Sequence, residues 1–196
     1  RVRQDFSGRS NVGAMFVNRS SVGNPSTSGD FNRSYAVDGQ WGIGQTGTIS
    51  GFAADTGSPG SHADTHAVSL IANYASERFR FSAGGSEVGP NFNPEVGFYS
   101  RRGYRRLDGQ ARATFRPENS MGIHQLEPHV SHYSVFDFDT GQEETRYTHF
   151  DNHLEWLNGY RVSTGVNLTT EGVFEAFELY PDIDVPVGIY NHTEGI

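Results

Sequence analysis

The chain contains no cysteine and no lysine, and none of its apolar runs is long. Without cysteine, the fold uses neither disulfide bonds nor thiolate metal sites. A helical membrane span needs about 18 or more consecutive apolar residues, and no such run is present. The net charge of −8 argues against nucleic acid as the main partner. All 15 cationic residues are arginines, whose fixed guanidinium fork suits carboxylates in a polar interior.

The sequence does contain strand-length segments in which apolar and polar residues alternate. The clearest segment is Leu107–Arg116, where odd positions are Leu, Gly, Ala, Ala and Phe, and even positions are Asp, Gln, Arg, Thr and Arg. A period of two places each set on its own face of a sheet. Such a sheet fits an up-and-down β-barrel in a membrane. It also fits a soluble sheet with one wet face.

We therefore predict an all-β fold, an antiparallel up-and-down meander of about ten strands that forms part of a transmembrane β-barrel. The predicted strands are Asn11–Arg19, Arg33–Ile43, Gly47–Ala54, Thr65–Tyr74, Arg78–Ser86, Tyr104–Arg116, Met121–Asp137, Glu143–Leu157, Tyr160–Thr169 and Val173–Tyr180. We expect residues 1–196 to be a single β-barrel domain that is a fragment of a larger barrel. The first predicted strand has no obvious partner upstream, and Tyr190–Ile196 does not resemble a closing strand.

The connections between these strands are alternately short and long. Short turns are predicted at Gln45-Thr46, Ala75–Glu77, Pro117–Ser120 and Asn158-Gly159, and longer loops at Ser20–Asn32, Asp55–Asp64 and Glu87–Gly103. Asn-Gly between alternating strands is a strong hairpin signal. The connection Asp139–Gln142 is short, although the alternation predicts a long connection at this place. Outer-membrane barrels sort their connections in this way, with tight turns at one end and long loops at the other.

Several segments resemble an uncharacterised bacterial family. They are Asn91–Phe98 (NFNPEVGF) followed by Arg101–Arg106, together with Val12–Arg19, Tyr35–Asp38 and Gly51–Thr56. Members of that family carry an N-terminal module like family-nine carbohydrate-binding domains, followed by a C-terminal membrane β-barrel. The resemblance covers most of this chain and implies that it lies within the barrel part. A link to carbohydrate is implied by this resemblance alone, since the carbohydrate-binding module is not present.

The loop Gly89–Arg106 is the first candidate site, because it interrupts the alternation and carries Asn93, Glu95, Arg101, Arg102, Arg105 and Arg106. Four arginines within six residues attract anions and can grip a carboxylate or phosphate bidentately. The loop is then a ligand-docking or constriction loop. Alternatively it is a structural clamp, in which arginine pairs with Glu95 and with carboxylates of the lumen.

The polar faces of Met121–Asp137 and Glu143–Leu157 supply the second candidate. A hairpin brings His129 opposite Asp151 or His153, depending on register. With His149, these residues form a possible site for Zn²⁺ or another divalent ion. Alternate residues on one strand lie about 7 Å apart, so cross-strand pairs are needed. The simpler interpretation is a histidine-rich polar lumen, and we predict no cofactor.

A third hypothesis is glycoside hydrolysis, which needs two carboxylates about 5–9 Å apart. Glu127 with Asp151 or Glu155 could provide them, although an acidic β-protein offers many such pairs.

The leading functional hypothesis is a segment of a bacterial outer-membrane β-barrel with a transport, structural or surface-anchoring role, linked to carbohydrate binding or uptake. Its partners are the lipid bilayer and a polysaccharide or oligosaccharide. Backbone groups in lipid need internal partners, which a closed sheet supplies. The residues expected to face lipid are Leu70, Phe79, Phe81, Ala111, Ala113, Val130, Leu154 and Val166, and those expected to face the lumen are Arg78, Arg80, Arg112, Arg116, Glu127, His129, His149, Asp151 and His153. The alternative is a secreted soluble β-protein that binds or hydrolyses glycans.

Overall fold

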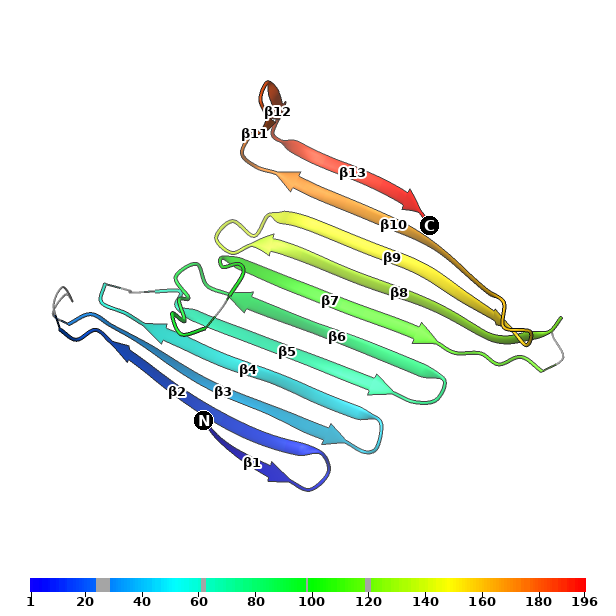
Figure 1. The fold of residues 1–196 in the computed structure, drawn as a ribbon, viewed down its shortest axis with the longest axis horizontal. Helices are drawn as coiled ribbons and strands as arrows, with labels where there is room; N and C mark the ends of the chain where they lie inside the picture. The colour runs from blue at the N-terminus through cyan, green and yellow to red at the C-terminus, as the bar shows by residue number, and fades with distance from the viewer. Residues whose placement is uncertain (24–28, 61–62, 98, 119–120) are drawn as a thin grey trace. The chain divides into compact units, whose positions relative to one another are not determined.

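The computed structural model describes residues 1–23, 29–60, 63–97, 99–118 and 121–196. In these residues the chain forms thirteen strands and no helix (Figure 1). Eleven strands make one antiparallel sheet in the order β1 to β10 and then β13, while β11 and β12 form a separate two-stranded sheet. The prediction of an all-β, up-and-down meander is therefore confirmed.

The strands of the main sheet are mostly long. Their bounds are β1 (Val2–Phe6), β2 (Ser10–Ser20), β3 (Phe31–Ile43), β4 (Gly47–Gly57), β5 (His66–Ala75), β6 (Phe79–Val88), β7 (Tyr104–Ala113), β8 (Ile123–Asp137), β9 (Glu143–Trp156), β10 (Arg161–Val173) and β13 (Gly188–Gly195). The small sheet consists of β11 (Phe177–Tyr180) and β12 (Ile183–Val185). Within the described residues β1 and β13 have one neighbour each, so the main sheet is open. No helix in this part of the chain is long and apolar enough to cross a bilayer.

The predictions for both ends of the meander were wrong. The first predicted strand does have an upstream partner, because Val2–Phe6 pairs with Ser10–Ala14. The chain end is also a strand, since β13 pairs with β10 from Gly188 to Gly195. The predicted strand Val173–Tyr180 is not continuous: Val173 ends β10, and Phe177–Tyr180 pairs with β12.

The interior boundaries agree more closely with prediction. The clearest difference is β7, which ends at Ala113 and leaves Phe115 in an isolated bridge with Leu126. The predicted Asn158-Gly159 hairpin is present, with Gly159 at a φ of 85° and the Trp156 amide bonded to the Tyr160 carbonyl. Residues 24–28, 61–62, 98 and 119–120 lie outside the described residues. They belong to four predicted connections, one of which contains the family-like motif.

The chain divides into two compact units. The first comprises Arg1–Asn73, Gly84–Arg106 and Asp137–Gly141, and the second comprises Tyr74–Ala83, Leu107–Phe136 and Gln142–Ile196. The expectation of a single domain remains a prediction.

In the first unit the register of β2, β3 and β4 separates two faces. Val37 pairs with Ala14 and with Ala53, so these side chains share one face. The apolar face of the first unit is formed by Val12, Ala14, Phe16, Tyr35, Val37, Trp41, Ile49 and Ala53. The polar face is formed by Arg19, Asn32, Ser34, Asp38, Gln40, Ser50 and Thr56.

The hydrophobic core of the first unit is small. Ala67, Val88 and Phe92 are buried together, and Ala54, Tyr99 and Tyr104 pack against them. Phe92 comes from the β6–β7 connection, so this core forms where that connection packs on the sheet.

The second unit has the same division of faces. Its polar face is formed by Gln125, Glu127, His129, Ser131, His149, Asp151, His153, Glu155, Ser163 and Asn167. Its apolar face is formed by Leu126, Val130, Phe150, Leu154, Val162 and Val166.

Candidate functional site

The β8–β9 hairpin brings four titratable side chains of the second unit together. His129 of β8 lies directly opposite Asp151 of β9, as one of the two predicted registers required. His149 and His153 flank Asp151 on the same face of β9, where they pair with Ser131 and Glu127. Antiparallel pairing with a two-residue period thus places one β8 histidine diagonally between two β9 histidines.

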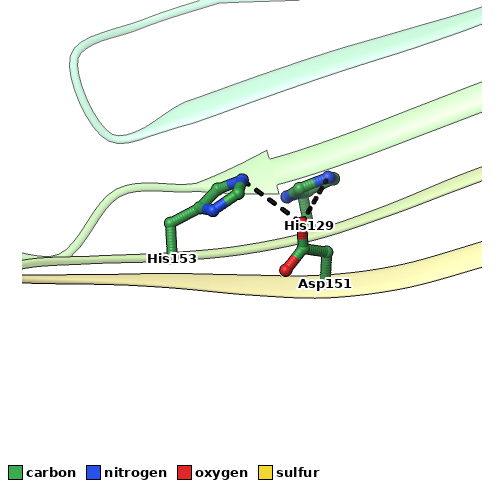
Figure 2. Close-up of side chains that lie close together, drawn as sticks. All are labelled: His129, Asp151 and His153. Atoms are coloured by element: carbon green, nitrogen blue, oxygen red, sulfur yellow. Dashed lines mark ion pairs between the residues drawn. The ribbon is translucent and has the colours of Figure 1, made fainter. Parts of the chain in front are cut away.

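All three imidazoles approach a single carboxylate oxygen, Oδ2 of Asp151. The Nε2 atoms of His153, His149 and His129 lie 3.3, 3.6 and 3.9 Å from it. Figure 2 shows His129 and His153 approaching this oxygen from different strands. The side chains of His129 and Asp151 are only 11% and 13% exposed, so water does not separate these groups as it would at a surface. We call His129, His149, Asp151 and His153 the histidine–aspartate cluster.

Hydrogen bonds from β10 and β13 fix the orientation of His149. Asn167 is buried and donates from Nδ2 to Oε2 of Glu194 at 3.0 Å. Its Oδ1 accepts a bond from the Tyr147 hydroxyl (2.8 Å) and lies 2.6 Å from His149 Nδ1. An amide oxygen can only accept, so His149 Nδ1 must carry the proton. The other β9 histidine, His153, is held by Ser163, whose Oγ lies 2.7 Å from its Nδ1.

A polar pocket of about 330 Å³ lies beside the cluster in the second unit. It is lined by Arg112, Gln125, Glu127, His153, Leu154, Glu155, Arg161 and Ser163. Two of the three proposed catalytic carboxylates, Glu127 and Glu155, share this pocket, whereas Asp151 belongs to the histidine–aspartate cluster. Glu127 accepts a hydrogen bond from the Thr114 hydroxyl (3.1 Å), and Glu155 forms an ion pair with Arg161 (2.9 Å).

The β6–β7 connection is anchored on the polar face of the first unit. The Asn93 amide donates to Thr56 Oγ1 at 2.9 Å, and the Asn93 carbonyl accepts from Asn32 Nδ2 at 2.8 Å. Both anchor side chains are buried. Pro94 begins a turn that the Gly97 amide closes at 2.7 Å. This turn presents Glu95 to the sheet.

Glu95 forms an ion pair with Arg19 of β2 and not with an arginine of its own loop. Arg19 Nε donates to Glu95 Oε2 (2.7 Å), and Nη1 donates to Asp30 Oδ2 (2.5 Å). The Arg19 guanidinium, with help from the Ser21 hydroxyl, lowers the pKa of Asp30 below its ordinary value of 3.8. Arg19 thus links the β2–β3 connection to the β6–β7 connection.

The four loop arginines of the predicted anion site lie in different surroundings. Arg105 forms an ion pair with Glu87 at 2.5 Å and donates to the Phe138 carbonyl at 2.7 Å. Its guanidinium also lies 4.5 Å from the centre of the Phe138 ring. Arg101 lies over Tyr104 instead, and Arg105 and Arg106 occupy alternate faces of β7. Arg102 is exposed. For Arg105 and Glu95, the clamp interpretation describes the geometry.

Several contributing residues were not predicted from the sequence. Asn167, Glu194, Arg19 and His66, which bonds Glu87 at 2.8 Å, all act through partners distant in sequence. Only the strand register reveals them, and a local pattern carries no such signal.

No family model, curated protein or solved structure matches this chain.

Proposed function

We propose that this chain forms part of the wall of a bacterial outer-membrane β-barrel, with its apolar face against lipid and its polar face toward the lumen. The observation that carries the proposal is the exposure of apolar side chains on strands that have neighbours on both sides. On β3, which lies between β2 and β4, Val37 is 55% exposed and Trp41 is 71% exposed. On β10, Val166 is 41% exposed.

A water-soluble sheet buries such a face against a second layer. Exposed apolar patches larger than a few hundred Å² mark membrane or partner contacts. Four of the eight residues expected to meet lipid agree with this interpretation, since Leu70, Phe79, Phe81 and Val166 are exposed, whereas Ala111, Ala113, Val130 and Leu154 are partly buried. In the described part of the chain, the buried hydrophobic residues are few: Ala67, Val88, Phe92 and Val135.

The lengths of the connections also support a membrane barrel. Successive connections of an antiparallel meander leave opposite ends of their strands. Residues 21–30, 58–65, 89–103 and 174–187 make long connections on one set of ends, and 7–9, 44–46, 76–78 and 157–160 make short ones on the other. Two connections depart from this alternation. The β7–β8 connection is longer than the other short turns, and the β8–β9 connection is short where the alternation predicts a long one. Strands of about 9–11 residues suffice to span a bilayer, and β2 to β10 reach this length.

The face proposed to meet the lumen then carries the histidine–aspartate cluster and the polar pocket in the second unit, and the anchored β6–β7 connection in the first. A loop held against the inner wall by buried Asn32 and Thr56 narrows such a lumen, as a constriction loop does. The proposed roles are solute passage, surface anchoring or display. Oligosaccharide is the proposed partner, on the strength of the family resemblance and the hydrogen-bonding groups of the pocket.

Single-cysteine scanning along β3 tests the proposal, because the chain has no native cysteine. Spin labels at Tyr35→Cys, Val37→Cys and Trp41→Cys are expected to be accessible to oxygen, which dissolves in lipid. Labels at Ser34→Cys and Gln40→Cys, on the polar face, are expected to be accessible to a water-soluble relaxing agent. Water accessibility at all five positions of the folded protein would refute the proposal.

The rival function is a secreted, soluble β-protein that hydrolyses glycans, which the shared placement of Glu127 and Glu155 favours. Detergent-free protein would then cleave a polysaccharide, and Glu127→Gln would abolish the cleavage. Arg116→Gln is the matched control, since Arg116 bonds Gln125 and does not line the pocket. Equal activity of wild type and Glu127→Gln would eliminate this function.

A further inference from the structure

We propose that His129, Asp151 and His153, whose ligand atoms lie within 4.8 Å of one another, bind a divalent transition metal ion of the zinc type, with His149 as the fourth ligand after a side-chain movement. The inference stands on side-chain geometry in the second unit and does not depend on whether the chain lies in a membrane.

The spacing of the ligand atoms fits coordination better than hydrogen bonding. Charge-assisted hydrogen bonds between imidazolium and carboxylate are about 2.7–2.9 Å long. The three separations from Asp151 Oδ2 are 3.3, 3.6 and 3.9 Å, which is longer in every case. In a tetrahedral site with metal–ligand bonds of about 2.0–2.1 Å, neighbouring ligand atoms lie about 3.3 Å apart. The ligand atoms of His129, Asp151 and His153 already lie within 4.8 Å of one another, whereas His149 must move toward them for one ion to take all four ligands.

The distance between alternate residues of one strand does not prevent this arrangement. The backbone sites of His149, Asp151 and His153 are separated by about 7 Å steps. Both imidazoles lean toward Asp151, which brings their Nε2 atoms within 3.6 Å of the same oxygen. His129 supplies the cross-strand ligand that the sequence argument required, and its ring centre lies 5.2 Å from those of both His149 and His153.

The orientation of His149 is a second observation. Its Nδ1 lies 2.6 Å from Asn167 Oδ1, which leaves Nε2 facing Oδ2 of Asp151 at 3.6 Å. Imidazole ligands of metals are commonly oriented by a hydrogen bond from the other ring nitrogen, as Asn167 orients His149.

The donor set selects the class of ion. Three imidazole nitrogens and one carboxylate oxygen suit zinc and its first-row neighbours, whereas magnesium and calcium prefer oxygen ligands. Arg112 lines the adjacent pocket and adds positive charge there, and Glu127 in the same pocket offsets it.

Metal titration of the purified, folded chain tests the site. After chelator treatment, we expect wild type to bind one Zn²⁺ per chain by calorimetry, and Co²⁺ to give the strong visible absorption of tetrahedral coordination. His153→Gln and Asp151→Asn should each raise the Kd for Zn²⁺ by about 10–100-fold or more, because loss of an outer-shell partner alone has an effect of that size. His132→Gln is the matched control: His132 lies on β8 beyond His129 but on the opposite face, bonded to Thr148.

Circular dichroism establishes that each variant is folded before titration. The proposal is supported when His132→Gln binds like wild type and the cluster variants lose both affinity and the cobalt absorption. It is overturned when folded wild type binds Zn²⁺ no more tightly than Asp151→Asn. A failure of this test leaves the barrel proposal intact, because the cysteine scan examines residues of β3 and none of the cluster.

Discussion

An arginine at position 37 would distinguish a lipid-facing sheet from a water-facing one. Val37 lies near the middle of β3 on the apolar face of the first unit, and its cross-strand neighbours are Ala14 and Ala53. Both neighbours are small, so the longer side chain meets no steric obstacle. The effect of Val37→Arg on the free energy of unfolding therefore reports the medium and not the packing.

The two environments predict different magnitudes. An arginine on the lipid face of a barrel destabilises it by about 2–4 kcal/mol near the bilayer midplane. At about 1.4 kcal/mol per tenfold change, this lowers the folding equilibrium constant by roughly 30- to 1,000-fold. An exposed position in water gives a change within about 0.5 kcal/mol.

Reversible urea unfolding in lipid vesicles, followed by tryptophan fluorescence, measures this difference. Ser50→Arg is the control, because Ser50 lies on the polar face in a pocket of about 420 Å³ that also contains Arg3, Asp38 and Gln40. We expect Val37→Arg to be destabilised and Ser50→Arg to remain close to wild type. Equal and small changes for both variants would refute the assignment of the apolar face to lipid.

Three further outcomes are expected. Arg19→Gln should remove the bonds that join Arg19 to Glu95 and Asp30, so that limited proteolysis cuts the β6–β7 connection faster than in wild type. Arg33→Gln is the control, because Arg33 bonds Asn18 on the neighbouring strand. The pKa of Asp30 is lower in the folded state than its ordinary value of 3.8. The Asp30 carboxylate therefore contributes fully to loop order above pH 3.8, and this contribution is lost as the pH falls through the lower pKa of the folded state. Hydrogen exchange in residues 29–32 should rise only in that acidic range. Asn167→Leu should weaken Zn²⁺ binding by about 10–100-fold without removing a ligand, because His149 loses the partner that orients its ring toward Asp151. Unchanged proteolysis, unchanged exchange or unchanged Zn²⁺ affinity would contradict the corresponding contact.

The sequence predicted the middle of the meander better than its ends. Strands such as β5 and β8 can be predicted because one face must be apolar and the other polar, and this requirement determines the residue type at every second position. β13 has no such pattern, since only Ile189 and Tyr190 are large apolar residues within Gly188–Gly195. It is a strand because its backbone pairs with β10 along its whole length. Pairing with a partner can override weak local preference, and the partner's position cannot be read from the segment itself.

The candidate site shows the same limit at the level of side chains. Alternation placed His129, His149, Asp151 and His153 on one polar face, and the hairpin allowed two registers. The choice of register, with His129 opposite Asp151, came from the structure. So did Asn167, which the sequence offers as an ordinary polar residue of a strand. Its importance comes from a chain of hydrogen bonds from β9 through β10 to β13, which links Tyr147 and His149 to Glu194.

The histidine–aspartate cluster and the apolar face of the second unit are consequences of one register. Moving β9 by one residue relative to its neighbours would turn His149, Asp151 and His153 to the apolar face and Phe150 and Leu154 to the polar face. The pairing that sets His129 against Asp151 also sets Val130 against Phe150, and β10 continues that row with Val166. The register that gives a continuous apolar surface therefore also holds the proposed metal ligands in position. If both proposals are correct, a substitution that shifted this register would disturb membrane insertion and metal binding together, whereas His153→Gln should weaken metal binding alone.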